Sequence, residues 1–316
     1  MRAQALALCC LLGCASSAAR IGNLQVLGSD GAQVYALSYR HVALYRFDRA
    51  EAVPVVSLGE PVALARGPAG QLYALDRAKR LAIVQIDLAH ATATTLATID
   101  DAVCELDAPR EAPGLVVVSG TAYVASGCLV RRVELATGEV SVVAGTPQVP
   151  SLSPVTCRDG RGSAAQLGSI SGIAIEGGAL YISSWFCHSI LRIDPASGDV
   201  TTASTGSDLG PFALVGDGHV YVADVDTIRM IDVASGAVTT IAGHKSTGCS
   251  TPPYRDGDRA TAEFAFAHQL ALVGGALFVG DGDALRRVDL ATGRVTTISG
   301  TPKGNCNTTI VPATAS

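Results

Sequence analysis

The sequence predicts an all-β protein, a six-bladed β-propeller whose blades are four-stranded antiparallel sheets. Three observations predict it. Of the 316 residues 48% are hydrophobic and only 16% are charged, so the chain can bury a large core and is not disordered. Glycine contributes 34 residues and aromatic residues only 5%, which favours short strands joined by tight turns. One pattern of strands and turns also recurs six times along the chain.

The N-terminal segment precedes the predicted fold. Met1 and Arg2 lead an apolar run of signal-peptide length, which is too short to span a bilayer as a helix. The run ends in the sequence LLGC, which resembles a bacterial lipobox and implies a signal peptide over residues 1–14 with lipidation of Cys14. Residues 15–22 then form a short tether.

Two alternatives to lipidation stay open. Cleavage near Ser17-Ala18-Ala19 would release a secreted or periplasmic protein, and the segment could also remain as an uncleaved anchor. No later stretch reaches the roughly 18 uninterrupted apolar residues that a transmembrane helix needs. We therefore expect an exported protein of the cell envelope, attached to a bacterial membrane through a lipid only.

The repeated unit contains an apolar strand, a strand led by an aromatic residue, a strand ending in Asp or Glu, and a Val/Thr strand, joined mostly by glycine turns. The aromatic positions are Tyr35, Tyr73, Tyr123, Tyr181, Tyr221 and Phe278. The acidic positions are Asp48, Asp87, Glu134, Asp194, Asp232 and Asp289. Four short strands with tight turns predict an antiparallel sheet. One such sheet cannot bury both faces, whereas six packed radially can, and a β-sandwich would not explain the recurrence.

Two stretches carry a family resemblance. CRDGRGSAAQLGSISGIAIEGGALYISSWFCHSILRID begins at Cys157, and RDGDRATAEFAFAHQLALVGGALFVGDGDALRRVD begins at Arg255. They resemble the NHL-repeat family, whose repeats read DGxGxxAxF, GIAV, LYVAD and RIRKID. The other units match only the strand pattern. The resemblance implies a propeller over residues 23–300 followed by a C-terminal tail over 301–316, and it says little about function.

Six of the nine cysteines remain after export, because Cys9 and Cys10 leave with the signal and Cys14 is lipidated or removed. An even number in an exported chain predicts disulfides, and no pair has the short spacing of a structural zinc site. The six are Cys104, Cys128, Cys157, Cys187, Cys249 and Cys306.

We label the strands of a blade A to D from the inside outward, so that B–C turns and D–A crossings lie at one end of the disc. The long insertions, 98–114, 145–169 and 244–268, are all D–A crossings. All six cysteines are therefore expected on one face. We predict the pairs Cys104–Cys128, Cys157–Cys187 and Cys249–Cys306, each contributing about 3 to 4 kcal/mol in the chain-entropy model.

This disulfide-stapled face is the expected contact surface for a protein, peptide or glycan of the envelope. Its candidate contact residues are Trp185, Phe186, Arg158, Arg161, Arg255 and Asp256. In the alternative the disulfides only stabilise the fold, and Trp185 and Phe186 only cover the Cys187 disulfide. A net charge of −5 without a Lys/Arg cluster excludes a nucleic-acid partner.

Several residues are weaker candidates for a metal site. Asp159 and Asp256 precede glycines but lack the acidic series of a calcium loop, so we expect them to cap the turns at 163–167 and 260–264. Asp76, Asp224 and Asp281, with serines at 38, 126 and 184, form a ring that holds a cation or polar ligand, or closes the B–C turns through backbone hydrogen bonds. We expect no cofactor, with a structural calcium or a channel metal as the alternative.

An enzyme is the competing class of function. Peptide-amidating lyases resemble this fold and bind a channel metal through histidines, but His219 and His268 have no evident third ligand. Gluconolactonase-like propellers use a Glu, an Asn and an Asp, and neither Glu176 nor Asn23 stands in a recognisable arrangement with the Asp ring. A Ser-His-Asp arrangement, a nucleotide fingerprint and GxSxG are absent. The sequence favours a non-catalytic binding or scaffold module over a metal-dependent lyase or lactonase.

Overall fold

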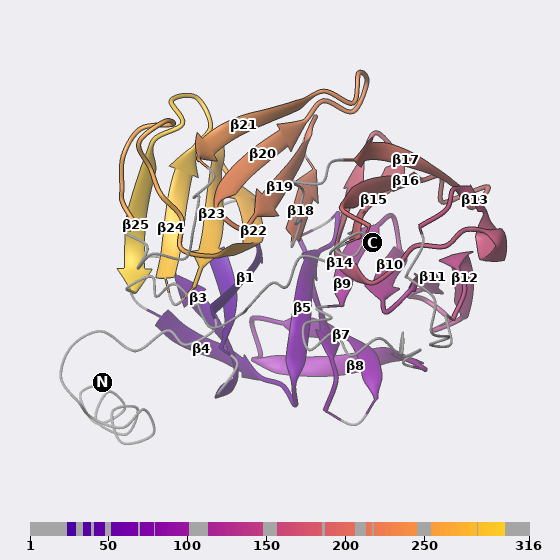
Figure 1. Cartoon of the computed structure of the whole chain (residues 1–316). Helices are drawn as coiled ribbons and strands as arrows, with labels where there is room; N and C mark the ends of the chain where they lie inside the picture. The colour runs from indigo at the N-terminus through magenta and orange to yellow at the C-terminus, as the bar shows by residue number, and fades with distance from the viewer. Residues whose placement is uncertain are drawn as a thin grey trace, which may run out of the picture.

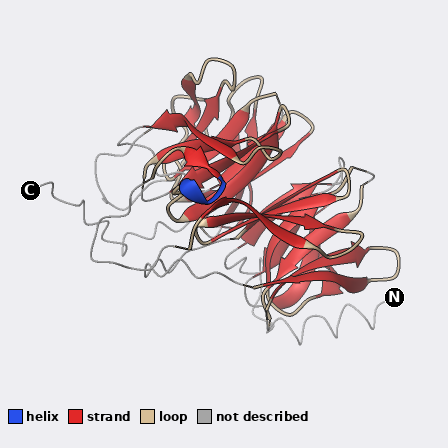
Figure 2. Cartoon of the chain, turned by 90° about the vertical axis from the view of Figure 1, so that its right-hand side faces the viewer, coloured by secondary structure: helices blue, strands red, loops and turns tan. Residues whose placement is uncertain are grey.

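The chain is a β-propeller built from four-stranded antiparallel blades, as a computed structural model shows (Figure 1). The structure describes residues 24–29, 34–38, 41–47, 52–68, 70–78, 80–100, 113–147, 157–184, 187–205, 213–216, 218–244, 254–282 and 284–300. Strands and turns make up nearly all of them, and η1 (Gly162–Ala164) is a single helical turn (Figure 2). Within these ranges, no helix is both long and apolar enough to cross a membrane.

The first three sheets each use four consecutive strands. Sheet 1 consists of β1 (Leu24–Ser29), β2 (Val34–Ser38), β3 (His41–Phe47) and β4 (Ala52–Ser57). Sheet 2 consists of β5 (Pro61–Arg66), β6 (Leu72–Asp76), β7 (Leu81–Asp87) and β8 (Thr92–Ile99). Sheet 3 consists of β9 (Gly114–Val118), β10 (Thr121–Ser126), β11 (Leu129–Glu134) and β12 (Val140–Gly145).

The remaining sheets follow the same rule, with one addition. Sheet 4 consists of β14 (Ile170–Glu176), β15 (Ala179–Ser184), β16 (Ser189–Ile193) and β17 (Asp199–Thr205), and β13 (Gly160–Arg161) pairs with the outer side of β17. Sheet 5 consists of β18 (Ala213–Gly216), β19 (Val220–Asp224), β20 (Thr227–Ile231) and β21 (Val238–Gly243). Sheet 6 consists of β22 (Ala267–Val273), β23 (Ala276–Asp281), β24 (Ala284–Asp289) and β25 (Val295–Gly300).

The first strand of each sheet lies at the centre of the molecule (Figure 1). These strands contact one another in the cycle β1, β5, β9, β14, β18, β22 and back to β1. The fourth strand of each sheet is therefore at the outer rim. The prediction of an all-β propeller with four-stranded antiparallel blades is confirmed, and each sheet comes from one continuous segment of chain.

The hydrophobic core lies between the sheets rather than in one central cluster. Val143 of sheet 3 and Ile182 of sheet 4 belong to one cluster, and Ile241 of sheet 5 and Val279 of sheet 6 belong to another. The tyrosines predicted to lead the B strands are all buried, since each packs into such a space between sheets. Radial packing thus buries both faces of sheets that would be unstable alone.

The acidic residues that end the C strands hold the turns that follow. Asp232 accepts hydrogen bonds from Ala234 N at 3.1 Å and Ser235 N at 2.8 Å, and Asp194 and Asp289 cap their turns in the same way. The hydrogen bonds that Asp232 accepts from Ser235 lower the pKa of its carboxyl below the ordinary value. These three aspartates are therefore turn caps at the end of the disc opposite the B–C turns, whereas Glu134 accepts from Thr121 Oγ1 at 3.2 Å and Asp48 lies outside the described residues.

Candidate functional site

Two inserted segments of similar structure lie between neighbouring sheets. We call residues 157–169 the sheet-4 insert and residues 254–266 the sheet-6 insert. Each insert folds back on itself through one antiparallel β-bridge. The bridge joins Arg158 to Gln166 in the sheet-4 insert and Arg255 to Glu263 in the sheet-6 insert. Each also buries its apolar residue completely or almost so, Leu167 at 0% exposure and Phe264 at 5%. The DGxGxxAxF-like pattern therefore forms a wedge whose apolar end fills the space between two sheets.

The Asp-Gly pairs attach the inserts to the outer strands. Asp256 accepts hydrogen bonds from Thr297 N and Thr297 Oγ1 of β25, both at 2.8 Å. Asp159 accepts from Thr202 N at 3.1 Å and Thr202 Oγ1 at 2.7 Å in β17. The prediction that these two residues cap the following turns is therefore wrong, because each insert runs beside an outer strand and its carboxylate faces that strand. In the sheet-6 insert the capping residue is Asp258, which accepts from Thr261 N at 3.0 Å.

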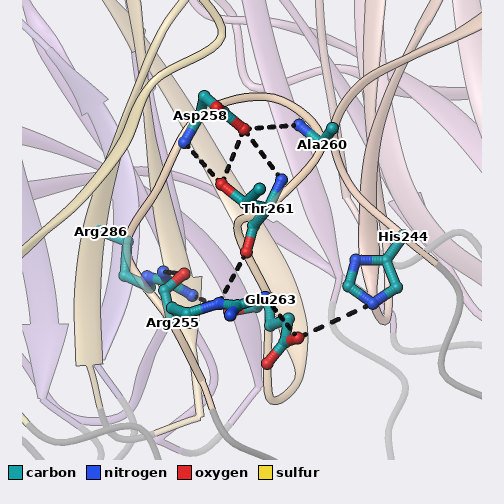
Figure 3. A network of polar contacts seen from close by, with 7 residues as sticks. All are labelled: His244, Arg255, Asp258, Ala260, Thr261, Glu263 and Arg286. Atoms are coloured by element: carbon teal, nitrogen blue, oxygen red, sulfur yellow. Dashed lines mark hydrogen bonds and ion pairs between the residues drawn. The ribbon is translucent and has the colours of Figure 1, made fainter.

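A buried cation underlies the sheet-6 insert (Figure 3). Arg286 is fully buried, and its Nη1 donates to Asp281 Oδ2 at 2.8 Å and its Nη2 to Asp256 Oδ1 at 3.1 Å. The guanidinium also donates to the carbonyl oxygens of Arg255 and Glu263 and lies 4.8 Å from the Phe264 ring centre. One side chain thus joins the insert to the body of sheet 6.

The two carboxylates of this cluster have different electrostatic environments. Burial raises the pKa of Asp281, although hydrogen bonds from Phe266 N and Arg286 act in the opposite direction. Burial also acts to raise the pKa of Asp256, but the hydrogen bonds from Thr297 and the charge of Arg286 together lower it below the ordinary value. Asp281 is completely buried, whereas the Asp256 side chain is about half exposed. The cluster is a fixed structural anchor.

Sheet 4 holds its insert by a disulfide instead. Leu191 occupies the position of Arg286, and Ser184 occupies that of Asp281. The predicted disulfide Cys157–Cys187 is confirmed, with Cα atoms 5.9 Å apart. Two homologous inserts are therefore fixed to their sheets by different chemistry.

The other cysteines are tested only in part. Cys128 is disulfide-bonded, while Cys104, Cys249 and Cys306 lie outside the described residues. The pairs Cys104–Cys128 and Cys249–Cys306 therefore stay predictions. Cys128 and Cys187 both lie in B–C turns, and Cys157 is bonded to Cys187, so the three described cysteines lie at one end of the disc. We call this end the loop face.

The predicted contact residues do not all lie on the loop face. Arg161 pairs with Asp199 at the start of β17, and its Nε donates to Ser197 O at 2.9 Å, so it lies at the opposite end. The strand β16 separates that position from Cys187 by about 17 Å at 3.4 Å per residue. The prediction that Arg161 lies on the loop face is therefore wrong, because the sheet-4 insert runs along β17 to the opposite end of the sheet.

The other contact residues have varied surroundings. Arg158 donates to Ala164 O at 3.1 Å within its own insert. Asp256 is directed at Thr297 and Arg286 and is structural rather than a free contact residue. Trp185 and Phe186 lie outside the described residues.

The aspartates of the predicted ring close their own sheets. Asp76 accepts from Gly59 N at 2.8 Å and Glu60 N at 2.6 Å, just before β5. Asp281 accepts from Phe266 N at 2.6 Å, just before β22, and Asp224 pairs with Arg229 at 2.9 Å. Asp76 also accepts from Ala78 N in its own B–C turn at 3.2 Å, so the predicted closure of the turn is confirmed there. For Asp281 that prediction is wrong, because its carboxylate faces the backbone of the crossing that leads into β22.

The two histidines proposed for a channel metal lie beside opposite ends of β19. His219 immediately precedes β19, whereas His268 follows Ala267, whose N donates to Val225 O just after β19. Five residues of strand separate the two ends by about 17 Å, so His219 and His268 cannot share one ion. Across the described ranges, no three His, Cys, Asp or Glu side chains gather closely enough to hold a metal ion.

A polar patch lies on the loop face between sheets 5 and 6 (Figure 3). It consists of His244, Arg255 and Glu263, which we call the 244/255/263 patch. Glu263 Oε1 accepts from Arg255 Nη2 at 3.1 Å and lies 3.8 Å from His244 Nε2. Its second oxygen, Oε2, is buried and has no hydrogen-bond partner. His244 and Arg255 are about half exposed, whereas the Glu263 side chain is only 21% exposed, so the surface of the patch is formed mainly by the Arg255 guanidinium and the His244 ring.

Sequence reasoning found only Arg255 of this patch. Glu263 faces Arg255 because the insert folds back on itself, and His244 comes from the end of the neighbouring sheet. The polar residue at position 263 directly before the buried Phe264 is the one signal that pointed to it.

Comparisons with known proteins support the fold. No family model and no curated protein matches the chain. A structural-genomics protein of unknown function from Bacteroides thetaiotaomicron is 14% identical, with a TM-score of 0.65 over 86% of this chain and 70% of its own. An auxiliary nutrient-binding protein from the same organism is 17% identical, with a TM-score of 0.60 over 88% and 70%.

A gluconolactonase from Xanthomonas campestris is 12% identical, with a TM-score of 0.58 over 88% of each chain. At these identities the similarity is one of architecture, and these structures include both a binding protein and an enzyme. The chain is similar to β-propeller proteins.

Proposed function

We propose that the protein is an extracytoplasmic binding or scaffold module whose loop face recognises a protein, peptide or glycan. The six sheets act as six blades of one closed ring that carries this face. Export fits the disulfide Cys157–Cys187, because disulfides persist in oxidising compartments. Attachment through a lipid on Cys14 belongs to the same proposal.

The observation that carries the proposal is the independent anchoring of two inserts between neighbouring sheets. A disulfide fixes the sheet-4 insert, and the buried Arg286 fixes the sheet-6 insert. Both anchors reduce the freedom of loops that would otherwise have to be ordered on binding, which lowers the entropic cost of recognition. Rigid loops on a stable scaffold are typical of binding surfaces.

The contact residues we propose are the 244/255/263 patch, with Arg158, Trp185 and Phe186 as further members of the face. The half-exposed Arg255 guanidinium and His244 ring favour a ligand that brings a hydrogen-bond acceptor. Glu263 Oε1 accepts from Arg255 at 3.1 Å and holds that guanidinium in place. Peptide carbonyls and sugar hydroxyls both meet this requirement.

The test is capture of envelope components by the immobilised domain, repeated against arrays of purified peptides and glycans. Glu263→Gln and Arg255→Ala should reduce binding of a defined ligand, whereas Arg161→Ala, at the opposite end, should leave it unchanged. Equal binding by all three variants would remove the loop face as the contact surface. Stoichiometric metal retained by the purified protein would favour the competing lyase or lactonase.

A further inference from the structure

The outer strands of the sheets differ in what covers them. In sheets 4 and 6 the chain's own Asp-Gly pair lies against the outer strand, with Gly160 opposite Val200 and Gly257 opposite Val295. Both valines are buried, at 2% and 0% exposure. The corresponding valine of sheet 5, Val238, is 38% exposed.

The covered strands share one short sequence and one set of hydrogen bonds. Each reads Val-Thr-Thr, and the second threonine gives its N–H and its hydroxyl to the aspartate of the insert, Thr202 to Asp159 and Thr297 to Asp256. Val295 and Gly257 exchange two backbone hydrogen bonds, at 2.8 and 3.2 Å. The aspartate thus recognises a threonine, and the following glycine continues the sheet by one residue pair.

Sheet 5 carries the same three residues, and within the described part of the chain no segment pairs with the outer edge of β21. Val238, Thr239 and Thr240 are exposed, and Thr240 occupies the position of Thr202 and Thr297. The crossing that leads into sheet 5 comprises only residues 206–212, whereas those into sheets 4 and 6 span 146–169 and 244–266. Residues 206–212 are too few to run along the outer strand of sheet 5 and back to the central strand β18.

We propose that the outer edge of β21 is a docking site for an extended segment of a partner polypeptide that carries an Asp-Gly pair. The partner's carboxylate accepts from Thr240 N and Oγ1, and its glycine pairs with Val238, as the chain's own inserts do in sheets 4 and 6. This is addition of a strand to an exposed sheet edge, in which backbone hydrogen bonds supply affinity and one side-chain contact supplies specificity. The site lies on the rim and goes beyond the proposed function of the loop face.

The other uncovered edges match less well. Sheet 3 has Val142 in place of the threonine, which removes the hydroxyl donor. Sheet 2 has Thr95 at that position but Ala93 in place of the valine. Sheet 5 alone among these three has the complete Val-Thr-Thr sequence.

The experiment uses a labelled peptide with the chain's own sequence YRDGDRATAEF, residues 254–264, titrated against the whole exported domain. We expect saturable binding that falls about tenfold when the peptide's first Asp is replaced by Asn, since hydrogen bonds to a charged acceptor are the stronger ones. Thr240→Val should weaken binding by about the same factor. Thr239→Val is the matched control and should bind as the parent does, because the aspartates of the two inserts bind the second threonine of Val-Thr-Thr and Thr239 is the first.

Unfolding midpoints of both variants show whether they fold, so that loss of binding is not mistaken for loss of structure. Absence of saturable binding, or equal binding by Thr240→Val and Thr239→Val, would overturn the proposal. Binding lost in Thr95→Val or Thr297→Val but kept in Thr240→Val would also overturn it, since the peptide then occupies another sheet. Self-association that depends on Thr240, without peptide binding, would likewise overturn it, because a second copy of the chain then occupies this edge.

Discussion

Replacing Arg286 tests how a buried charge holds the sheet-6 insert. Arg286→Leu removes two ion pairs, of 2.8 and 3.1 Å, and leaves the carboxylate of Asp281 buried at 0% exposure without its cation. Breaking a buried ion pair in this way costs about 3 to 5 kcal/mol. That is a large share of the roughly 5 to 15 kcal/mol by which a native protein is stable.

Sheet 4 shows which second substitution compensates for the loss of Arg286. It has Leu191 at the position of Arg286 and Ser184 at the position of Asp281. The double variant Arg286→Leu, Asp281→Ser removes the unpaired charge and should recover about 2 kcal/mol relative to the single variant. Arg287→Leu is the control, since its 3.2 Å pair with Asp289 is partly exposed and is worth less than about 1 kcal/mol. Urea unfolding monitored by circular dichroism measures all three. A double variant no more stable than Arg286→Leu would refute the argument that the unpaired Asp281 charge dominates the cost.

Three further predictions concern the disulfide, the turns and the histidines. Cys187→Ser removes the disulfide to Cys157 and should lower the free energy of unfolding by about 2 to 4 kcal/mol, as measured by denaturant unfolding. A reductant should therefore destabilise the parent protein more than it destabilises this variant. The pKa of Asp232 is lowered in the folded state by the hydrogen bonds from Ser235, so its stabilising contribution is present above the ordinary aspartate pKa and is lost as the pH falls through the folded-state pKa. Thermal unfolding scans should therefore show a smaller acid-induced drop for Asp232→Asn, and an unchanged drop would contradict the capping role. His219→Ala combined with His268→Ala should leave the metal content unchanged in elemental analysis, because His219 immediately precedes β19 and His268, in β22, lies beside the other end of β19. Loss of a bound ion would contradict that placement.

The success of the fold prediction and the failures at the site have a common physical basis. Aromatic, acidic and glycine positions repeat with the strands, and local rules for turns and alternation are enough to order four strands into a sheet. The cysteine pair 157–187 followed from the same strand order, since parity places both residues at one end. The aspartates at 159 and 256 could not be interpreted in this way. Their hydrogen-bond partners, Thr202 and Thr297, lie about forty residues further along the chain.

The sequence by itself determined the all-β propeller with four-stranded antiparallel blades, because each blade is built from contacts between neighbours along the chain. Only the tertiary structure decided which inserted residues face a ligand and which hold the inserts in place. Arg255 meets Glu263 and His244 because segments from two sheets come together on the loop face. The exposed edge of β21 likewise becomes apparent only when its outer strand is compared with those that the chain already covers. Such long-range pairings depend on how the sheets pack, and the local pattern does not encode them.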